Sequence, residues 1–456
     1  MVKRETAKKG LILLFWMGVW QLFTVGMDNP ILLAGPIEVL VRLLTDLQKT
    51  EFWQTILISS GRIMTGFLCA FLGGGLLAAV SHRVKLVREL SEPLIYVMKS
   101  VPIVSFVVIL LIGFGSGRLS VWVAFLIAFP NLYMQVLQGL ESTDEKLLEA
   151  AKVYDMPFWN RIWYLYRPAA APFLKSGCRV SIGMAWKSGV AAEVIGLPEF
   201  SIGENIYMSK IYLDTAGVLS WTVVCILLSY LFEKFFLAAL KFFLRVRVPI
   251  QRVHEKRQSG VRLEIKQLSK RYGQKIILKE YSQVFQAGSC YAFTEPSGRG
   301  KTTLFRMLCG LEKPDDGQIK GHIEGTKEVE RFCRMAFQEN RFFPELTTEE
   351  NLALVCPKPE GGWNALITEL LPANCLHQRM GQFSGGMARR VEVLRCMLSA
   401  GEVLILDEPF SGLDAENREK TAAFILSKQL GRCILLAAHD PAEVELLGAT
   451  PLSFTE

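Results

Sequence analysis

The sequence predicts a two-domain protein: an all-α polytopic membrane domain with six transmembrane helices, followed by an α/β domain built around a phosphate-binding loop. Two observations carry this prediction. Long uncharged apolar runs are confined to about the first 245 of the 456 residues, and several of them have the length that a bilayer requires. From position 261 onward, strand-like and helix-like runs alternate, as they do in α/β domains.

Composition supports a membrane protein. Half of the residues (50%) are apolar and only 21% are charged, which is unusual for a wholly soluble chain. The formal net charge is +7, but the basic residues flank apolar runs instead of forming one dense patch, so we expect no nucleic-acid partner. The ten cysteines form no C-x-x-C pair, which favours reduced, buried thiols over zinc sites or disulfides.

The predicted membrane domain covers residues 1–245. Its six apolar stretches of bilayer length lie at about 10–27, 54–80, 93–114, 119–140, 172–196 and 217–242. The first follows a basic segment as a secretory signal would, but no small-x-small cleavage site comes after it, so we interpret it as a span. Lysine and arginine gather on the side that carries both chain ends, and we expect that side to be cytoplasmic.

Three charged residues fall inside the predicted spans: Arg62, Lys187 and Glu193. Charges within a bilayer are costly, so each needs an explanation. They form interhelical pairs, reach toward an interface, or line a transport path, and the sequence leaves these alternatives open.

The longest loop on the predicted cytoplasmic side spans about residues 141–170. Phe158, Ile162 and Leu165 recur at offsets of four and three, which places one apolar stripe on a short helix. We expect Arg167-Pro168 to end that helix. Such a stripe is typical of a helix that lies on a surface.

The chemistry of the second domain centres on residues 295–303, which read E-P-S-G-R-G-K-T-T between a strand-like run and a helix-like run. Glycines let backbone N–H groups face an anion, the lysine reaches the β and γ phosphates, and a hydroxyl suits Mg²⁺. This pattern predicts a nucleoside triphosphate site made by Pro296, Ser297, Gly298, Arg299, Gly300, Lys301, Thr302 and Thr303.

One residue departs from the pattern G-x-x-x-x-G-K-[ST], because Glu295 stands where the first glycine belongs. A side chain there is expected to strain a tight turn, and its carboxylate repels phosphate unless it points outward. On this interpretation Glu295→Gly tightens nucleotide binding by about 1 kcal/mol. The alternative is that Glu295 points outward and supports the loop, for instance by pairing with Arg299.

A buried strand over 403–406 ends in two adjacent carboxylates, Asp407 and Glu408. Phosphoryl transfer to water needs charge neutralisation and an aligned nucleophile. We expect Thr302 and Asp407 to hold Mg²⁺, and Glu408 to polarise the attacking water as a general base.

A series of motifs in this half resembles, in order, an ABC-type ATPase. They are Tyr272-Gly273, the loop 295–303, the segment 336–344, the segment 383–387, the strand 403–407 with Glu408, the segment 411–414 and His439-Asp440. The resemblance implies that Tyr272 stacks on adenine, that Gln338 touches Mg²⁺ or the attacking water, and that His439 contacts the γ-phosphate. The region 340–383 is short for this family, so we expect a trimmed helical subdomain.

The segment F-S-G-G-M at 383–387 resembles the family's signature motif, although Met387 replaces the usual glutamine. Ser384, Gly385 and Gly386 open a helix and offer amides and a hydroxyl to phosphate. In the family these groups serve the nucleotide bound by the partner domain. One chain carries one of each half-site, so we expect a homodimer.

The loop around Glu149-Ala150-Ala151 resembles the coupling loop of permease subunits of bacterial ABC importers. Apolar segments at 61–67, 100–103 and 113–115 resemble permeases of the nitrate/sulfonate/taurine importer group. The resemblance implies that Glu149, Ala150, Ala151 and Phe158 couple the permease to its ATPase, a function with ATP and Mg²⁺ as cofactors.

Together these features predict a fused permease–ATPase half-transporter. Residues 1–245 form the permease, 246–260 a charged linker, and 261–456 the ATPase, which we expect in the cytoplasm of a bacterial cell beneath its lipid bilayer. An extracytoplasmic binding protein is expected to deliver a solute of the nitrate/sulfonate/taurine or thiamine-precursor group. The alternatives are an export or signalling ATPase and a degenerate, low-activity ATPase; short inward loops favour import.

Overall fold

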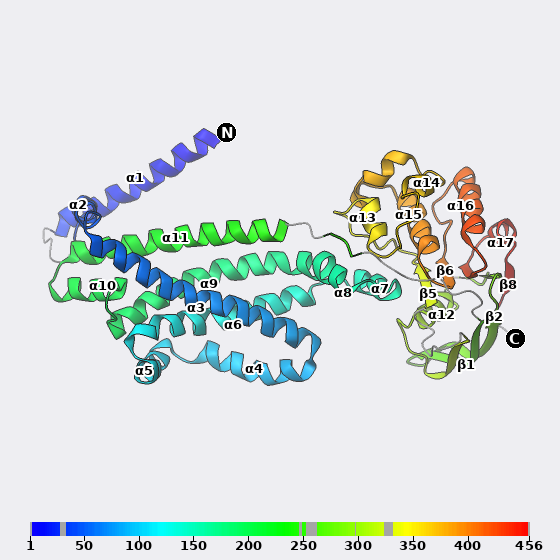
Figure 1. The fold of residues 1–456 in the computed structure, drawn as a ribbon, viewed down its shortest axis with the longest axis horizontal. Helices are drawn as coiled ribbons and strands as arrows, with labels where there is room; N and C mark the ends of the chain where they lie inside the picture. The colour runs from blue at the N-terminus through cyan, green and yellow to red at the C-terminus, as the bar shows by residue number, and fades with distance from the viewer. Residues whose placement is uncertain are drawn as a thin grey trace. The chain divides into compact units, whose positions relative to one another are not determined.

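The computed structural model describes residues 2–27, 33–245, 249–251, 262–296, 298–322 and 332–454. It divides into two compact units, one made of Met1–Ser142 and Arg167–Arg247, the other of Thr143–Tyr166 and Val248–Glu456. The first is helical and the second is α/β (Figure 1), which confirms the predicted fold class. The segment Thr143–Tyr166 packs with the α/β unit, although it lies in the middle of the predicted membrane domain.

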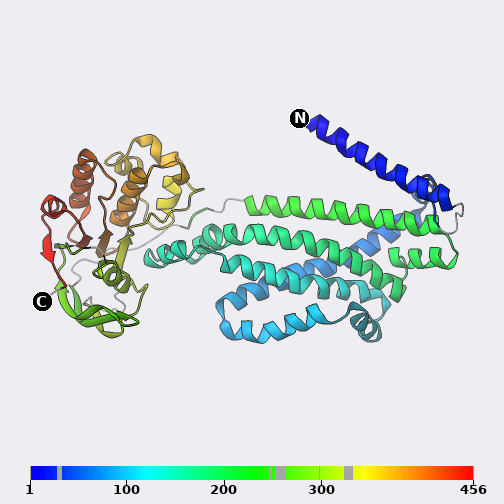
Figure 2. The ribbon, with the colours of Figure 1, turned by 180° about the vertical axis from the view of Figure 1, so that it is seen from behind.

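The helical unit is built around four long helices that lie side by side in both views, α3, α6, α9 and α11 (Figures 1 and 2). Its described helices are α1 (Val2–Met27), α2 (Pro36–Asp46), α3 (Thr50–Arg83), α4 (Lys85–Ser100), α5 (Ile103–Phe114), α6 (Ser116–Glu141), α9 (Arg167–Gly196), α10 (Ile202–Ile211) and α11 (Thr215–Arg245).

Small residues allow these helices to approach closely. A Cβ added at Gly66 of α3 would lie 2.2 Å from the backbone oxygen of Val121 in α6, and one at Gly139 of α6 would lie 2.9 Å from the Cα of Ala170 in α9. Such contacts are typical of helices that pack within membranes, where small residues at the interface bring backbones together.

Four described helices are long and apolar enough to cross a membrane: α1 over Gly10–Met27, α3, α6 and α11. The pair α4 and α5 qualifies as a fifth span only with a bend of 101° between them. The predicted span 93–114 is therefore wrong as a continuous helix, because Pro102 lacks an N–H and disfavours helical backbone at the residue before it. The predicted span 172–196 lies within α9, and six spans stay a prediction.

The α/β unit contains two sheets. An antiparallel sheet has the order β2-β1-β4, and a parallel sheet has the order β5-β6-β7-β3-β8. The strands are β1 (Arg262–Tyr272), β2 (Lys275–Phe285), β3 (Cys290–Phe293), β4 (Asp316–His322), β5 (Cys333–Ala336), β6 (Val403–Asp407), β7 (Cys433–Ala437) and β8 (Thr450–Leu452). Because the five parallel strands share one direction, the segments that follow β3, β6 and β7 meet at one edge of the sheet.

The parallel sheet is the core of this unit. Every residue of β5, β6 and β7 is buried, as expected for apolar strands covered on both faces. The remaining described helices of this unit from α12 onward are α12 (Lys301–Leu308), α13 (Thr348–Ala353), α14 (Asn364–Ile367), α15 (Gly385–Leu398), α16 (Ala415–Lys428) and α17 (Pro441–Leu446).

The region 340–383 contains only short elements, as expected for a trimmed helical subdomain, but its size relative to the family stays a prediction. Besides α13 and α14 it holds two turns of 3₁₀ helix, η3 (Ala373–His377) and η4 (Met380–Gln382). A capping box formed by Thr347 and Glu350 starts α13.

The segment Thr143–Tyr166 contains α7 (Glu145–Val153), α8 (Phe158–Asn160) and a π-helical turn, η1 (Arg161–Tyr166), which runs directly into α9. The expectation that Arg167-Pro168 ends a helix is wrong, because α9 begins at Arg167. Proline is tolerated in the first turn of a helix, where its missing N–H has no partner to lose. The predicted apolar stripe is divided: Leu165 is buried, whereas Phe158 is 55% exposed.

Candidate functional site

The predicted phosphate loop follows β3 and leads into α12. Gly298 has a φ of 83° and Gly300 a φ of 104°, values that glycine adopts without the steric cost of a side chain. Gly300 precedes the first residue of α12, Lys301, so the backbone amides at this helix start face the loop. Pro296 and Arg299 are exposed, and Ser297 lies outside the described residues.

Lys301 is folded into the loop, with its Nζ donating to the backbone oxygen of Glu295. The side chain is buried. Burial lowers its pKa, while the carboxylates of Glu408, Asp407 and Glu295 act in the opposite direction. The ammonium is thus held at the loop, and a lysine in this place is the residue type that binds the β and γ phosphates.

Thr302 and Asp407 come together although 105 positions separate them, since the Oγ1 of Thr302 donates to Oδ2 of Asp407 at 3.1 Å. Burial raises the pKa of Asp407; the hydrogen bond from Thr302 lowers it, and the nearby Glu408 charge raises it. A hydroxyl beside a carboxylate is the hard oxygen pair that Mg²⁺ prefers, so the residues present fit this ion. Gln338, the third predicted ligand, is exposed.

Glu408 and His439 form a direct pair, with Oε1 of Glu408 2.6 Å from Nε2 of His439. Glu408 has a φ of 55°, a left-handed conformation that costs a non-glycine residue free energy and is found at functional sites. Its amide donates to the backbone oxygen of Ala437, at the end of the neighbouring strand β7. Two of the three side chains predicted to be catalytic, Glu408 and His439, are thus held side by side, and the third is Gln338.

Arg389 connects the segment before Gln338 to the end of β6, a role that was not predicted from the sequence. It is 3% exposed, and its guanidinium donates to the backbone oxygens of Phe337, Asp407 and Glu408. It therefore fixes the segment that carries Gln338 against the two catalytic carboxylates. The only signal in the sequence is its place on the first turns of α15, after the signature segment.

The remaining predicted nucleotide contacts lie on separate elements of the α/β unit. Tyr272 ends β1 with half of its side chain exposed, and its hydroxyl donates to Glu312. Ser384 caps α15, its Oγ accepting from the Met387 amide at 3.4 Å, and both Ser384 and Gly385 are exposed. An exposed helix start of this kind is open to a ligand that comes from outside the unit.

The strain expected at Glu295 is absent, since this residue is not among those with a positive φ. Its carboxylate accepts from the backbone N–H of Phe454, and the Phe454 ring stacks on Phe293 of β3 with centroids 5.2 Å apart. No ion pair joins Glu295 to Arg299 in the described part of the chain. The structure therefore favours the interpretation in which Glu295 supports the loop over the one in which it weakens nucleotide binding. Its partner is Phe454, which the sequence did not suggest.

We expect Glu295→Gly to leave ATP affinity unchanged or weaker, in place of the tighter binding expected from sequence. The substitution removes a charged acceptor from the Phe454 amide, and it should lower the free energy of unfolding of the α/β unit by roughly 1–2 kcal/mol. Isothermal titration with ATP and thermal unfolding check this, with Glu295→Gln, which keeps an acceptor oxygen, as the matched control. Tighter binding by the glycine variant would restore the defect interpretation.

Glu149 makes the most extensive polar contacts of the segment Thr143–Tyr166. Its carboxylate accepts from Arg306 of α12 at 3.0 Å and 2.5 Å, and from Arg341 at 2.5 Å. Burial acts to raise its pKa, but the hydrogen bonds and charges of the two arginines outweigh it, and the pKa is lowered. One carboxylate thus links the helix after the phosphate loop to the segment that follows Gln338.

The rest of the segment anchors this carboxylate. Ala150, Ala151, Val153, Tyr154 and Met156 are buried in the core of the α/β unit. The Tyr154 hydroxyl donates to the backbone oxygen of Met335 in β5 at 2.9 Å, and the guanidinium of Arg395 lies 4.6 Å from the Tyr154 ring. Phe158, also predicted to take part in coupling, is 55% exposed, and its role in coupling stays a prediction.

The three predicted transport-path residues differ in their surroundings. Glu193 is fully buried, and its Oε2 accepts from Ser59 Oγ at 2.6 Å and from the Gly203 amide at 3.3 Å, so it ties together α9, α3 and α10. Arg62 donates to the backbone oxygen of Glu199 at 3.3 Å. Lys187 is exposed on α9 and makes no ion pair within the described helical unit. Their role in transport stays a prediction.

Comparison with known proteins matches both units. The family described as ABC transporter matches residues 278–411, and the family described as binding-protein-dependent transport system inner membrane component matches residues 71–245. The spermidine/putrescine import ATP-binding protein PotA of Chromobacterium violaceum is 35% identical over 195 residues, 40% of this chain and 54% of its own length. The chain thus spans about half the length of that relative.

A second relative is covered more completely. The aliphatic sulfonates import ATP-binding protein SsuB 3 of Pseudomonas savastanoi pv. phaseolicola is 34% identical over 190 residues, 40% of this chain and 69% of its own length. Among solved structures, an ATP-binding subunit of an ABC transporter aligns with 40% of this chain and 81% of its own, at 27% identity and a TM-score of 0.37.

Proposed function

This chain belongs to the ABC transporter family and joins an inner-membrane permease domain to an ABC ATPase domain, and we propose that it imports a small solute, driven by ATP hydrolysis. The observation that carries the proposal is the three-residue contact of Glu149 with Arg306 and Arg341. A segment between two long apolar helices is thereby fastened to the elements on either side of the nucleotide site. We propose that this contact is the one through which the ATPase domain acts on the permease.

The proposed reaction uses groups already in place. The loop amides and Lys301 bind the β and γ phosphates, and Thr302 and Asp407 are the residues that would hold Mg²⁺. That ion supplies neutralisation of the charge on the phosphate oxygens. Glu408 accepts a proton from the attacking water as the oxygen bonds to the γ phosphorus and the bond to the bridging oxygen of ADP breaks.

His439 and Arg389 have supporting roles in this proposal. His439 holds Oε1 of Glu408 by its 2.6 Å contact and lies where it can reach the γ-phosphate. Arg389 prevents the Gln338 segment from separating from Asp407 and Glu408, because it binds backbone oxygens of both elements. We propose that Gln338 senses the γ-phosphate and that Glu149 transmits the response to the permease.

The assembly we propose is a homodimer. In this proposal the helix start at Ser384, Gly385 and Gly386 does not serve the nucleotide bound by the phosphate loop of its own chain. Ser384 and Gly385 are exposed, so this helix start is available to nucleotide held by a second copy. The basic residues at both chain ends favour a cytoplasmic location for the termini and for the ATPase domain 261–456, joined by the linker 246–260 to the permease domain 1–245. A binding protein then delivers the solute from outside.

The solute group we propose is that of the nitrate/sulfonate/taurine or thiamine-precursor importers, and the sulfonate relative supports it. The pairing of Glu408 with His439 speaks against a degenerate ATPase, because the groups required for hydrolysis are present in contact. An export or signalling role lacks a specific observation in its favour.

Reconstitution of the full chain tests the function. In proteoliposomes that contain the co-encoded binding protein, we expect ATP-dependent uptake of labelled solute and stimulation of ATP hydrolysis by the loaded binding protein. A Lys301→Ala variant, which loses the phosphate contact, serves as the inactive control. Hydrolysis that no binding protein stimulates, with no uptake, would contradict import.

A further inference from the structure

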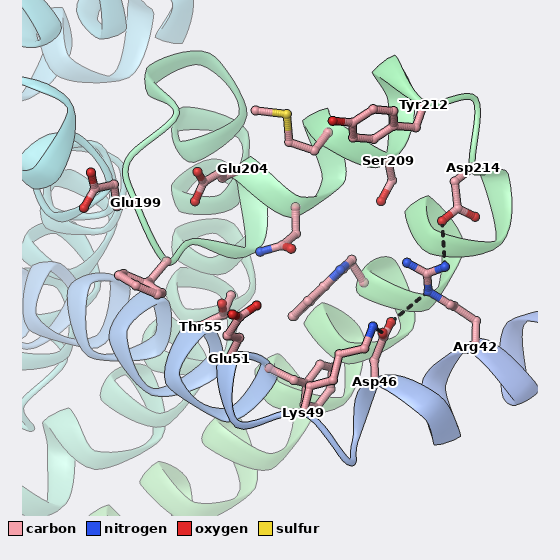
Figure 3. A pocket seen from close by; sticks show the side chains of 15 residues that line it. Arg42, Asp46, Lys49, Glu51, Thr55, Glu199, Glu204, Ser209, Tyr212 and Asp214 are labelled. Atoms are coloured by element: carbon pink, nitrogen blue, oxygen red, sulfur yellow. Dashed lines mark hydrogen bonds and ion pairs between the residues drawn. The ribbon is translucent and has the colours of Figure 1, made fainter.

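A cavity of about 660 Å³ opens at one end of the helical unit. It is formed by the end of α2, the start of α3, the turn before α10, α10 itself and the start of α11 (Figure 3). Its volume lies within the range of small-molecule sites. In the predicted topology this end faces outward, where a delivered solute enters.

The charges around the cavity do not balance. Arg42 pairs with Asp46 at 3.0 Å and with Asp214 at 3.1 Å, and Lys49 pairs with Asp46 at 2.7 Å. Both basic residues of the lining are therefore neutralised by two carboxylates on one side of the cavity (Figure 3).

Three further carboxylates of the lining, Glu51, Glu199 and Glu204, have no cationic partner within the described residues. Figure 3 shows Glu199 and Glu204 on the side opposite the Arg42 pairs, and Glu51 beside Thr55. An opposite charge placed between them would gain attraction from all three, and an anion would be repelled.

Two buried hydroxyls also face the cavity without a partner. Thr55 is 3% exposed and Ser209 is 8% exposed; both line the cavity, and neither side chain makes a hydrogen bond to any residue that the structure describes. Buried polar groups are ordinarily hydrogen-bonded. Their hydroxyl oxygens are free to accept from a ligand that donates.

Aromatic side chains complete the lining. Phe52 and Trp221 are buried, with ring centroids 4.9 Å apart, and the rings of Phe200 and Tyr212 are partly exposed at the cavity. Aromatic faces attract cations and exclude water from the site. Carboxylates, hydroxyl acceptors and aromatic rings are together the chemistry that recognises an alkylammonium group.

We propose that this cavity binds an ammonium-bearing organic solute, and that such amines are the class of molecule that the permease accepts. The inference rests on the proposed function in one respect, namely that the ligand of the cavity is the transported solute. It divides the proposed solute group: aminosulfonates carry an ammonium group, whereas nitrate and simple alkyl sulfonates do not.

Binding to the full chain in nanodiscs, without nucleotide or binding protein, tests the proposal separately from transport. Three probes share a four-carbon chain and differ in the charged groups at its two ends: putrescine has two ammonium groups, 4-aminobutyrate has one ammonium and one carboxylate, and succinate has two carboxylates. We expect saturable binding that is strongest for putrescine, weaker for 4-aminobutyrate and absent for succinate, measured by isothermal titration or by Trp fluorescence.

The variants Glu204→Gln and Glu199→Gln should each weaken putrescine binding about tenfold, the effect of removing one close opposite charge from a partly enclosed site. Thr55→Val, which removes only the hydroxyl, should weaken it about threefold. Glu89→Gln is the matched control, because Glu89 is exposed on α4 outside the cavity, and it should leave binding unchanged.

Succinate binding equal to that of putrescine overturns the proposal, as does absence of putrescine binding in a preparation whose ATP hydrolysis shows it to be intact. Loss of binding-protein stimulation in Glu204→Gln, with no binding of free amine to the parent, would instead assign the cavity to protein docking and overturn it. Failure of ATP-driven uptake, with amine binding intact, would contradict only the proposed function.

Discussion

Glu408→Gln is expected to reduce ATP turnover at least a hundredfold while ATP affinity stays within about twofold of the parent value. The substitution removes the proton acceptor but keeps the shape of the side chain and an oxygen for His439, and positioned general bases contribute factors of 10²–10⁴. Phosphate release by the full chain in nanodiscs measures turnover, and nucleotide titration measures affinity.

The control for this prediction is Glu416→Gln, an exposed carboxylate on α16 whose partner is Lys420. It should leave turnover unchanged, since an exposed ion pair within a helix contributes little. Turnover of Glu408→Gln within twofold of the parent would remove Glu408 from the role of base.

The second large effect is expected from Glu149→Arg, which should reduce solute uptake at least tenfold while basal ATP hydrolysis stays within about twofold. The new guanidinium would face Arg306 and Arg341, and three like charges at hydrogen-bond distance repel one another. Glu149 bonds to Arg306 and Arg341 and not to the side chains predicted to bind phosphate or activate water, so we expect basal hydrolysis to persist without this carboxylate. Uptake and hydrolysis measured in the same proteoliposomes separate the two effects.

Glu145→Arg is the matched control, since Glu145 is on the same helix but is exposed. The double variant Glu149→Arg with Arg341→Glu should recover part of the uptake, because it restores an opposite-charge pair. Parental uptake by Glu149→Arg would show that the segment has no part in coupling.

The direction in which pH changes the ion pairs of Glu149 with Arg306 and Arg341 follows from the pKa of Glu149. The pKa of Glu149 is lowered from its ordinary value of 4.5, so its ion pairs contribute stability above pH 4.5 and lose it as the pH falls through the lowered value. We expect coupling to be constant from pH 8 to about pH 5.5, because Glu149 is fully charged throughout that window.

The fold class could be predicted because its signals are local. Apolar runs and the order of motifs lie along the sequence itself, and the strand ending in Asp407 and Glu408 is visible as four apolar residues before two carboxylates. The break between α4 and α5 was missed for a physical reason: apolar composition continues across Pro102, although its backbone cannot continue the helix.

The role of Glu295 could not be predicted, because its partner Phe454 is 159 positions away and is found only once β8 pairs with β3. Arg389 escaped notice for a related reason, since it acts through backbone oxygens, which have no sequence signature. The amine cavity likewise combines residues 42–55 with residues 199–221, and neither stretch alone indicates a site.

The segment Thr143–Tyr166 packs with the α/β unit and is also part of the same polypeptide, so its docking is an intramolecular event. Covalent attachment sets an effective concentration, which reaches millimolar for short connections. A contact that would be too weak to hold separate chains together can then be occupied nearly all the time, and can exchange between arrangements without dissociation of the ATPase. Fusion thus makes the occupancy of this contact independent of the protein concentration.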